Sequence, residues 1–207
     1  MFAVGKWSLG LWCEQQRRSI GRRTSAAART LGSGVRDLEG LTITALQCVA
    51  PPRAMWRIVY VTKACTSKHA YWSYMLLLLG HYPSIGVQTA GLFYLSRRLN
   101  TVLKHLVRQP RPYNEYPHMI LYFKKRKRSL SFPSQSVQSL WIIRDAVGRM
   151  PTRHALPMLV YFTAVLAGVC LTRMYRGLHY PHDFLFSLLL AQALCTCRAF
   201  LCEEEVL

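Results

Sequence analysis

The chain has 207 residues, of which 51% are hydrophobic, and it carries 27 Lys and Arg against 9 Asp and Glu. This length allows one domain or one bundle of membrane helices. The formal net charge of +18 indicates an anionic partner. Because the cationic residues border long apolar stretches, we expect phosphate-bearing lipid and membrane lipids as partners, and no nucleic acid. The seven cysteines form neither a zinc-type pair of pairs nor an even set for disulfides, so they do not indicate a redox compartment.

The N-terminal residues 1–40 are expected to form a basic, disordered tail. Within residues 1–36 there are seven Lys and Arg and a single acid, Glu14. A tail of this kind suits the cytosolic side of a membrane. Because the segment is also rich in Arg and Ser and poor in acids, an organelle transit peptide, such as a mitochondrial one, is the alternative.

Residues 41–67 are expected to form interfacial or connecting helices. An apolar run in this region is short and stops at Pro51 and Pro52. After the two prolines, Arg57 and Lys63 are mixed with aromatic and aliphatic residues. This mixture is typical of a helix that lies in the membrane interface and does not cross it.

Residues 68–202 contain the apolar stretches that are expected to cross a membrane. Two of them, 155–171 and 183–201, are long and almost free of charge, as a spanning helix requires. No hairpin pattern or internal repeat is visible. We therefore predict an all-α fold, a polytopic transmembrane helix bundle, followed by an acidic tail at 203–207.

Three other helical stretches in this region are less clear. The stretch 70–80 is apolar but short. The stretch 84–106 becomes polar in its second half, which should face the bundle interior or the interface. The stretch 134–148 carries Arg144 and Asp145, so we expect a buried or short helix there.

The first of three polar clusters ends the helix expected at 84–106. It contains Lys104 and Arg111, seven residues apart, and Pro110 and Pro112 stop the helix. Lysine supplies a point charge and arginine a planar fork, a pair suited to phosphate oxygens. The alternative is a basic helix end whose side chains reach toward the membrane surface.

The second cluster is the segment 132–136. Pro133 followed by Ser134, ahead of an apolar helical run, predicts a helix start with Ser134 as the N-cap. Helix N-termini offer free backbone N–H groups and bind phosphate readily. The alternative is an ordinary cap without a ligand.

The third cluster, 172–183, lies between the two clearest spans. Asp183 follows His179 by four residues, so its carboxylate can accept the imidazole N–H and orient the ring for nucleophilic catalysis. A metal site made of His179, His182 and Asp183 is the competing interpretation. We disfavour it because no further ligand cluster is present and the neighbouring Arg173 would repel a cation.

Together the clusters resemble the type 2 phosphatidic acid phosphatase and vanadium haloperoxidase superfamily, whose signature is KxxxxxxRP, then PSGH, then SRxxxxxHxxxD. The residues that match the first and third motifs are Lys104, Arg111, Pro112, Arg173, His179 and Asp183. Thr172 replaces the serine of the third motif. The resemblance covers roughly residues 68–202 and implies a membrane phosphatase-like domain of this kind there.

The second motif departs from the family pattern. Pro133 and Ser134 match it, but Gln135 stands where the family has glycine. Ser136 stands where the family has the histidine that serves as the general acid.

The resemblance implies hydrolysis of a lipid phosphate or an isoprenoid diphosphate without a metal. His179 would attack phosphorus to give a phosphohistidine, and Asp183 would orient its ring. The residues that would hold the phosphoryl oxygens are Lys104, Arg111, Ser134, Gln135 and Arg173. No cofactor is expected, because the cations supply the charge stabilisation that a metal would give.

The missing acid at Ser136 bears on the substrate. Loss of a general acid typically costs about 10²–10⁴ in rate. A phosphate leaving group, with a pKa of about 6 by analogy with phosphate monoesters, needs the proton less than an alkoxide does. We therefore expect a slow enzyme or one that prefers isoprenoid diphosphates, with His118 or His182 as alternative proton donors.

A catalytically inactive family member that binds phospholipid or a membrane partner is the alternative function, and Ser136 favours it. With one crossing by residues 134–148, all three clusters fall on one membrane face. The basic loop 124–128 lies on that face and predicts that it is cytosolic. We expect a multi-pass protein of the endoplasmic reticulum or another internal membrane, with mitochondrial targeting as the alternative.

Overall fold

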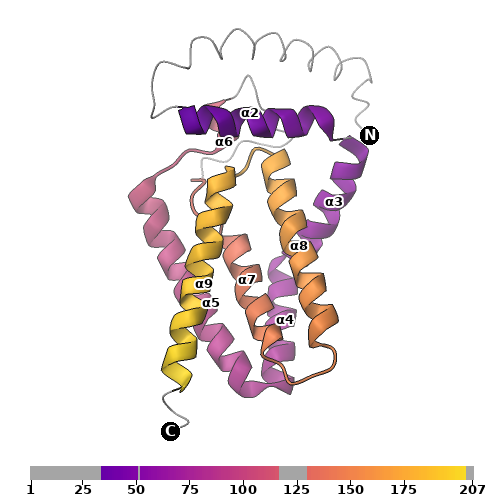
Figure 1. Ribbon diagram of the computed structural model, residues 1–207, viewed down its shortest axis with the longest axis vertical. Coiled ribbons are helices and arrows are strands. Elements are labelled where there is room, and N and C mark those ends of the chain that lie inside the picture. Colours follow the sequence, from indigo (N-terminus) through magenta and orange to yellow (C-terminus); the bar gives the residue numbers. More distant parts are fainter. Residues whose placement is uncertain (1–33, 51, 117–129, 204–207) are drawn as a thin grey trace.

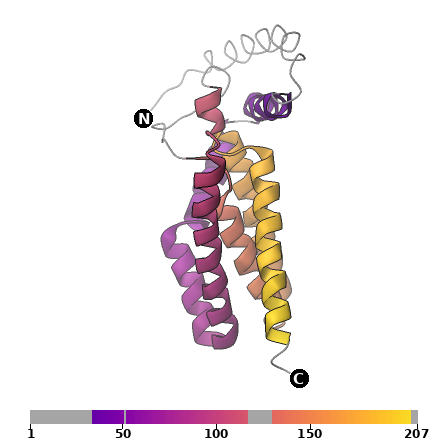
Figure 2. The same ribbon diagram turned by 90° about the vertical axis from the view of Figure 1, so that its left-hand side faces the viewer.

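The computed structural model describes residues 34–50, 52–116 and 130–203, and every element in these ranges is a helix. The helices are α2 (Gly34–Val49), α3 (Pro52–Cys65), α4 (Lys68–His81), α5 (Pro83–Val107), α6 (Pro112–Glu115), α7 (Gln135–Gly148), α8 (Ala155–Tyr175) and α9 (Pro181–Glu203). Figures 1 and 2 show a bundle of long helices, with α2 lying across one end and the last turns of α9 at the other.

Some of the sequence predictions lie outside the described residues. These are the structure of the tail up to residue 33, His118, the basic loop 124–128 and the acidic tail beyond Glu203, which is the last residue of α9.

Helices α4 and α5 form an antiparallel hairpin that turns at Tyr82. Ser67 caps the start of α4 by accepting a backbone N–H at 3.1 Å, and Pro83 occupies the first turn of α5. Gly86 allows the two helices to pack closely, because a Cβ at this position would lie 2.8 Å from the Cα of Leu79. The long helix expected at 84–106 is present, whereas α4 remains a short helix of 14 residues.

Helix α7 is the centre of the bundle and packs against α5, α8 and α9. Its buried aliphatic residues are Val137, Leu140, Ile142, Ile143 and Val147. Gln138 on the same helix is also buried, and its side-chain oxygen accepts from Ser96 at 2.9 Å and from Asn100 at 3.2 Å. The helix expected at 134–148 is thus both short and buried, and the side-chain oxygen of its buried Gln138 is satisfied by two hydrogen bonds.

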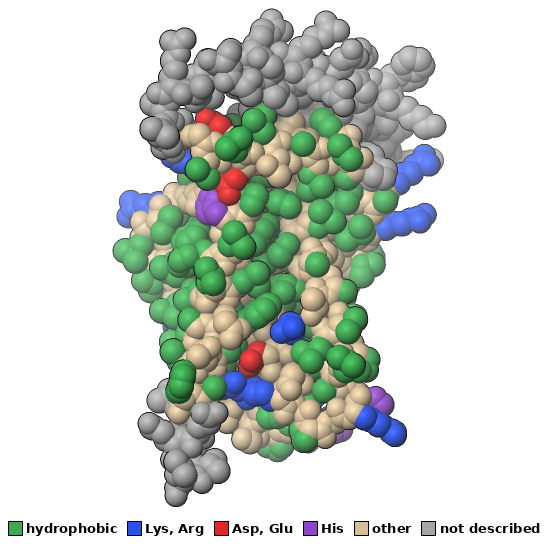
Figure 3. Space-filling view, viewed as in Figure 1, with side chains coloured by type: hydrophobic (Ala, Val, Ile, Leu, Met, Phe, Trp, Pro, Cys, Tyr) green, Lys and Arg blue, Asp and Glu red, His purple; other side chains and the backbone are tan. Residues whose placement is uncertain are grey.

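The outer surface of the bundle is largely apolar. Figure 3 shows hydrophobic side chains over much of its side. Leu156 of α8 is 71% exposed and Leu189 of α9 is 70% exposed. A large exposed apolar surface is unfavourable in water and favourable in lipid. Within the described ranges, two helices are long and apolar enough to cross a membrane, Ala155–Tyr175 and Pro181–Phe200, and they coincide with the two clearest predicted spans.

Helix α2 is fastened to the end of the bundle where α8 ends and α9 begins. Its Ile43 is fully buried in a cluster with Tyr113 and Tyr180. Its Gln47 donates a side-chain N–H to the backbone carbonyl of Tyr175 at 2.5 Å. The helix therefore has both apolar and polar attachments to the bundle.

The prediction of a disordered tail up to residue 40 is wrong for residues 34–40, which form the first turns of α2. These residues find partners far along the chain. The hydroxyl of Tyr116 donates to the carboxylate of Asp37 at 2.9 Å, and Arg36 lies 3.5 Å from Glu115. Tertiary contacts of this kind stabilise a helix that local sequence alone does not indicate.

The three polar clusters meet at the α2 end of the bundle. Helix α5 ends there, α7 begins there, and the chain passes there from α8 to α9 (Figure 1). Segments that are far apart in the sequence therefore surround one region, as the single crossing by residues 134–148 predicts.

Candidate functional site

His179 and Asp183 form a buried pair at the α2 end of the bundle. Nδ1 of His179 lies 3.3 Å from Oδ2 of Asp183, and both side chains are almost inaccessible to solvent. With Nδ1–H donated to the carboxylate, the lone pair of the neutral ring is on Nε2. The spacing of four residues thus brings together a ring and the group that can orient it.

The turn between α8 and α9 holds His179 in place. Gly177 has a φ of 60°, a left-handed conformation that favours glycine. In this turn the backbone N–H of Leu178 donates to the carbonyl of Arg173 at 2.9 Å, which closes the end of α8. Pro181 then starts α9. His179 is therefore fixed between two helix ends.

Asp183 lies in the first turn of α9 and is bound from several directions. Its Oδ2 accepts the backbone N–H of Tyr180 at 3.0 Å and the hydroxyl of Ser131. The bond from Tyr180 is the half of a capping box in which the third helical residue reaches back to the N-cap. The backbone N–H of Asp183 itself donates to the backbone carbonyl of Tyr180 at 3.1 Å. Ser131 is not among the predicted site residues, and its sequence signal is only that it lies two residues before Pro133.

Burial keeps the ring of His179 neutral at pH 7. It lowers the pKa of His179 to about 4, and the positive charges of Arg173 and Arg111 act in the same direction. The hydrogen bond and negative charge of Asp183 oppose this shift without cancelling it. A neutral imidazole is the form that can act as a nucleophile.

Lys104 lies in the last turn of α5, against the segment that precedes α7. Its Nζ donates to the backbone carbonyls of Leu130, Ser131 and Pro133, at 3.3, 3.5 and 3.0 Å. Its charge lies within electrostatic reach of the two other cationic residues of the predicted site. Lys104 therefore both shapes the second cluster and adds positive charge to the site.

Two arginines complete the positive region. Arg111 is the N-cap of α6, and its Nη1 donates to the carbonyl of Leu178 at 3.2 Å. Arg173 lies in the last turn of α8, and its Nη2 donates to the hydroxyl of Ser136 at 2.7 Å. The charges of both arginines act on His179. Concentrated positive charge around a buried histidine suits an anion with several negative oxygens.

Ser134 is the N-cap of α7, as predicted, but its side chain makes no capping hydrogen bond. Its backbone N–H instead donates to the hydroxyl of Ser187 at 2.7 Å. Its own hydroxyl is buried and has no hydrogen-bond partner in the described part of the chain. The side chain of Gln135 turns along its own helix, where Nε2 donates to Ser139 at 3.4 Å. An unpartnered buried hydroxyl at a helix N-terminus is a group that an anion can satisfy.

Both ring nitrogens of His182 have partners away from the ring of His179. Nδ1 lies 2.6 Å from the carboxylate of Glu39, and Nε2 lies 2.9 Å from the side-chain nitrogen of Gln109. Across the described ranges, no three His, Cys, Asp or Glu side chains are grouped to hold a metal ion. Glu39 and Gln109 were not predicted as site residues. Glu39 falls in the segment expected to be a disordered tail, and Gln109 falls in the first cluster, where only the cationic residues were considered.

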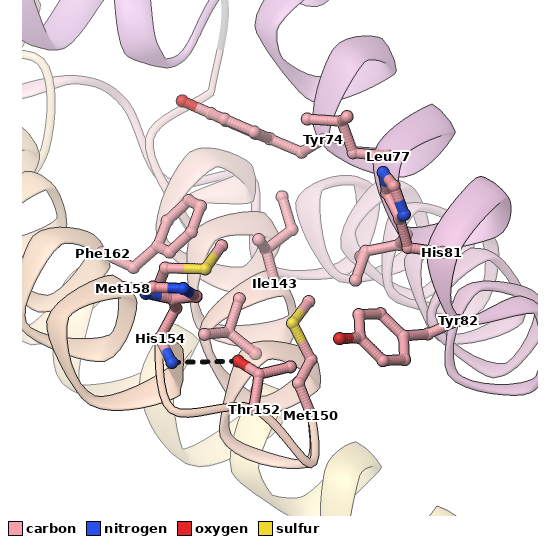
Figure 4. A pocket seen from close by; sticks show the side chains of 12 residues that line it. Tyr74, Leu77, His81, Tyr82, Ile143, Met150, Thr152, His154, Met158 and Phe162 are labelled. Carbon is pink, nitrogen blue, oxygen red and sulfur yellow. Dashed lines mark hydrogen bonds between the residues drawn. The ribbon is translucent and has the colours of Figure 1, made fainter.

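A separate cavity of about 300 Å³ lies at the other end of the bundle, among α4, α7 and α8. Figure 4 shows aromatic and aliphatic side chains around it, including Tyr74, Ile143 and Phe162, with His81 and His154 at its sides. No Lys, Arg, Asp or Glu lines it. The cavity therefore lacks the positive charge that a phosphate group needs and is separate from the site at the α2 end.

Comparison with known families finds a match to one family model, described as the PAP2 superfamily, over residues 85–201. The matched region contains the three polar clusters and excludes α2, α3 and α4. Comparison with curated protein sequences finds no significant match.

Two solved structures share the arrangement of helices. One is the crystal structure of the first transmembrane PAP2-type phosphatidylglycerolphosphate phosphatase from Bacillus subtilis, with a TM-score of 0.68, 18% sequence identity and coverage of 95% of each chain. The other is the crystal structure of Aquifex aeolicus LpxE, with a TM-score of 0.63 and 18% identity, covering 76% of this chain and 92% of that one. At this identity the likeness concerns the fold.

Proposed function

The chain belongs to the PAP2 superfamily, and we propose that it is a multi-pass membrane enzyme that hydrolyses a lipid phosphate or an isoprenoid diphosphate. The observation that carries the proposal is the buried pair of His179 and Asp183, with 3.3 Å between Nδ1 and Oδ2. Lys104, Arg111 and Arg173 place positive charge at the same end of the bundle. A phosphatase named for a phospholipid substrate shares the fold, which supports lipid phosphate as the substrate class.

The proposed first step is attack by Nε2 of His179 on phosphorus. The Nε2–P bond forms while the bond from phosphorus to the leaving oxygen breaks, and the leaving oxygen takes the electron pair. Asp183 accepts Nδ1–H and stabilises the positive charge that develops on the ring. Water then attacks the phosphorus of the phosphohistidine: the new O–P bond forms, the Nε2–P bond breaks with its electron pair returning to Nε2, and one proton of the water passes to solvent. Inorganic phosphate and the neutral ring are the products.

The cationic residues are proposed to stabilise the phosphoryl oxygens during both steps. Arg111 and Arg173 are close enough to His179 for their charges to affect its ring. Fixed positive charges in a site with little water are effective at stabilising a charged transition state. The buried hydroxyl of Ser134 is proposed to donate to one phosphoryl oxygen, since it has no acceptor among the described residues.

The chemistry of the leaving group favours a diphosphate. At the position of the missing acid, the Ser136 hydroxyl accepts from Arg173 at 2.7 Å. A serine hydroxyl is too weak an acid to protonate an alkoxide efficiently near neutral pH. A departing phosphate needs that proton less, because its pKa is about 6 by analogy with phosphate monoesters. We therefore propose faster turnover of isoprenoid diphosphates than of lipid monoesters.

The location of the enzyme is proposed to be an internal membrane, such as the endoplasmic reticulum, with the α2 end on the cytosolic side. The basic residues 124–128 lie in the connection between α6 and α7, two helices at that end. Positively charged loops favour the cytosolic side.

A catalytically inactive protein that binds phospholipid is the second candidate, and the replacement of the acid by Ser136 favours it. The test is phosphate release by the purified protein from phosphatidate, a sphingoid phosphate and a polyisoprenyl diphosphate, with His179→Ala as the control. We expect release that depends on His179 and is fastest for the diphosphate. Binding of these lipids without release above the control would support the inactive protein.

A further inference from the structure

Helix α2 contributes a carboxylate to the site although it precedes the residues 85–201 that match the family model. Oε2 of Glu39 lies 2.6 Å from Nδ1 of His182, and Oε1 accepts the backbone N–H of His182 at 3.0 Å. The side chain of Glu39 is only 12% exposed. One shielded carboxylate thus accepts two hydrogen bonds, which fix both the backbone and the ring of His182.

His182 in turn adjoins the pair that is proposed to perform the reaction. Its Nε2 lies 3.3 Å from Oδ1 of Asp183, while Oδ2 of the same carboxylate lies 3.3 Å from Nδ1 of His179. The ring of His182 also stacks on Tyr180, with 5.4 Å between centroids and an interplanar angle of 10°. The side chains of Glu39, His182, Asp183 and His179 thus form one continuous chain of polar contacts.

The two oxygens of Asp183 are held unequally. Oδ2 accepts from Tyr180 and Ser131 and faces His179, whereas Oδ1 is buried without a hydrogen bond from any described residue. The ring of His182 is the polar group beside Oδ1. Because a buried carboxylate oxygen responds strongly to its nearest polar neighbour, the placement of His182 affects how the carboxylate of Asp183 is held.

We propose that Glu39 is a positioning residue of the active site, which acts by fixing His182 against Asp183 and, through Asp183, orienting His179. The inference rests on the proposed function. It assigns α2 a part in catalysis, in addition to its packing on the bundle. A carboxylate that orients a histidine beside a reacting group is a recurrent device in metal sites, where its removal costs about 10–100-fold.

The test compares two alanine substitutions on the same helix, Glu39→Ala and Asp37→Ala. Both remove a carboxylate that fastens α2 to the bundle, but Asp37 bonds to Tyr116 and not to His182. For Glu39→Ala we expect kcat to fall about 10-fold with KM changed by less than about twofold. Glu39→Gln should recover part of the loss, because its amide oxygen can still accept from Nδ1. Asp37→Ala should keep kcat within about twofold of the unchanged protein.

A double substitution separates positioning from loss of packing. If Glu39 acts through His182, then Glu39→Ala should cause little further loss of kcat in a His182→Ala background. Additive losses, an equal fall of kcat in Asp37→Ala, or an unchanged kcat in Glu39→Ala would each overturn the proposal.

A second readout does not depend on turnover. In protein labelled with ¹⁵N-histidine, the ring nitrogens of His179, assigned with His179→Ala, should shift in Glu39→Ala and stay unchanged in Asp37→Ala. Unchanged ring signals in both variants would overturn the positioning role. If the chain releases no phosphate from any lipid, the proposed function fails, and this spectrum still decides whether Glu39 positions His179.

Discussion

Arg173 donates from Nη2 to the hydroxyl of Ser136 at 2.7 Å. The residue that replaces the family acid therefore occupies a donor that the proposed reaction needs for the phosphoryl group. Binding of a phosphate would require Arg173 to exchange this partner for a phosphoryl oxygen. In the proposed reaction, the departure in the second motif would therefore affect both proton donation and the availability of a cation.

Substitution of Ser136 by histidine should speed monoester hydrolysis. The imidazole can supply the proton that an alkoxide needs, and a general acid contributes about 10²–10⁴ in rate. We expect kcat on phosphatidate to rise by at least about 10-fold, with a smaller change on a polyisoprenyl diphosphate. The measurement is phosphate release from both substrates at saturation.

Ser136→Ala is the matched control for this substitution, because it removes the hydroxyl and adds no acid. If the two variants accelerate the monoester equally, release of Arg173 explains the gain. An equal gain on monoester and diphosphate in Ser136→His would contradict the proposed dependence on the leaving group.

Replacement of Asp183 by asparagine should lower kcat strongly while the fold is kept. Asparagine can still accept the backbone N–H of Tyr180, but its amide cannot stabilise an imidazolium as a carboxylate does. An equivalent change in a serine protease triad costs about 10⁴, and we expect a loss of about 10²–10⁴ here. Steady-state kinetics check the loss, and thermal unfolding checks the fold. A kcat within a few-fold of the unchanged protein would contradict the role of Asp183.

The dependence of activity on pH should follow the neutral ring of His179. Burial lowers its pKa to about 4, so the nucleophile stays unprotonated as the pH falls through 6.5. We expect the acidic limb of kcat/KM, which reports groups of the free enzyme, to lie near pH 4. The ionisation of the substrate is measured separately by ³¹P NMR. A limb near pH 6.5 that the substrate does not explain would contradict this prediction.

The lowered pKa of His179 also makes the stability of the folded protein depend on pH. Unfolded histidine titrates at about 6.5 and binds protons more readily than the buried ring does. His179 should therefore contribute to a loss of stability as the pH falls from about 6.5 toward 4. Thermal unfolding of the detergent-solubilised protein should show a smaller decrease over this range in His179→Ala.

Gly177→Ala should destabilise the turn that carries His179. Its φ of 60° is left-handed, and a side chain there costs about 1–2 kcal/mol. Gly91→Ala is the matched control, since a Cβ at that position of α5 meets no atom within 4 Å. We expect a lower Tm and lower kcat for Gly177→Ala and an unchanged or higher Tm for Gly91→Ala. Equal effects of the two substitutions would contradict the importance of the turn.

Much of the fold and of the site follows from local sequence. The spans at α8 and α9 are visible as long uncharged runs, and the type 2 phosphatidic acid phosphatase kind of helical bundle is confirmed by the family match and the similar structures. The pair of His179 and Asp183 meets because four residues across a helix start place them side by side. Contacts of this kind join residues that are close in the sequence, so a single sequence is enough to predict them.

The contacts that could not be predicted join residues that are far apart. Glu39 was expected in a disordered tail, because nothing near it indicates a partner 143 residues later. Ser131 bonds to Asp183, which lies 52 residues later in the sequence, and Lys104 of α5 binds the carbonyls of the same short segment. Burial of α7 likewise depends on three other helices. The mixed composition of the segment predicted a short or buried helix, but it did not identify the helices that pack against it.

The most direct measurement for the central proposal is the detection of phosphate on His179 itself. The protein is mixed with a polyisoprenyl diphosphate, quenched rapidly under alkaline conditions and digested, and the peptides are analysed by mass spectrometry. We predict one phosphoryl group on His179, absent from His179→Ala and more abundant in Asp183→Asn if hydrolysis of the intermediate slows more than its formation. Phosphate release that persists in His179→Ala, or turnover without any phosphorylated His179, would contradict the proposal.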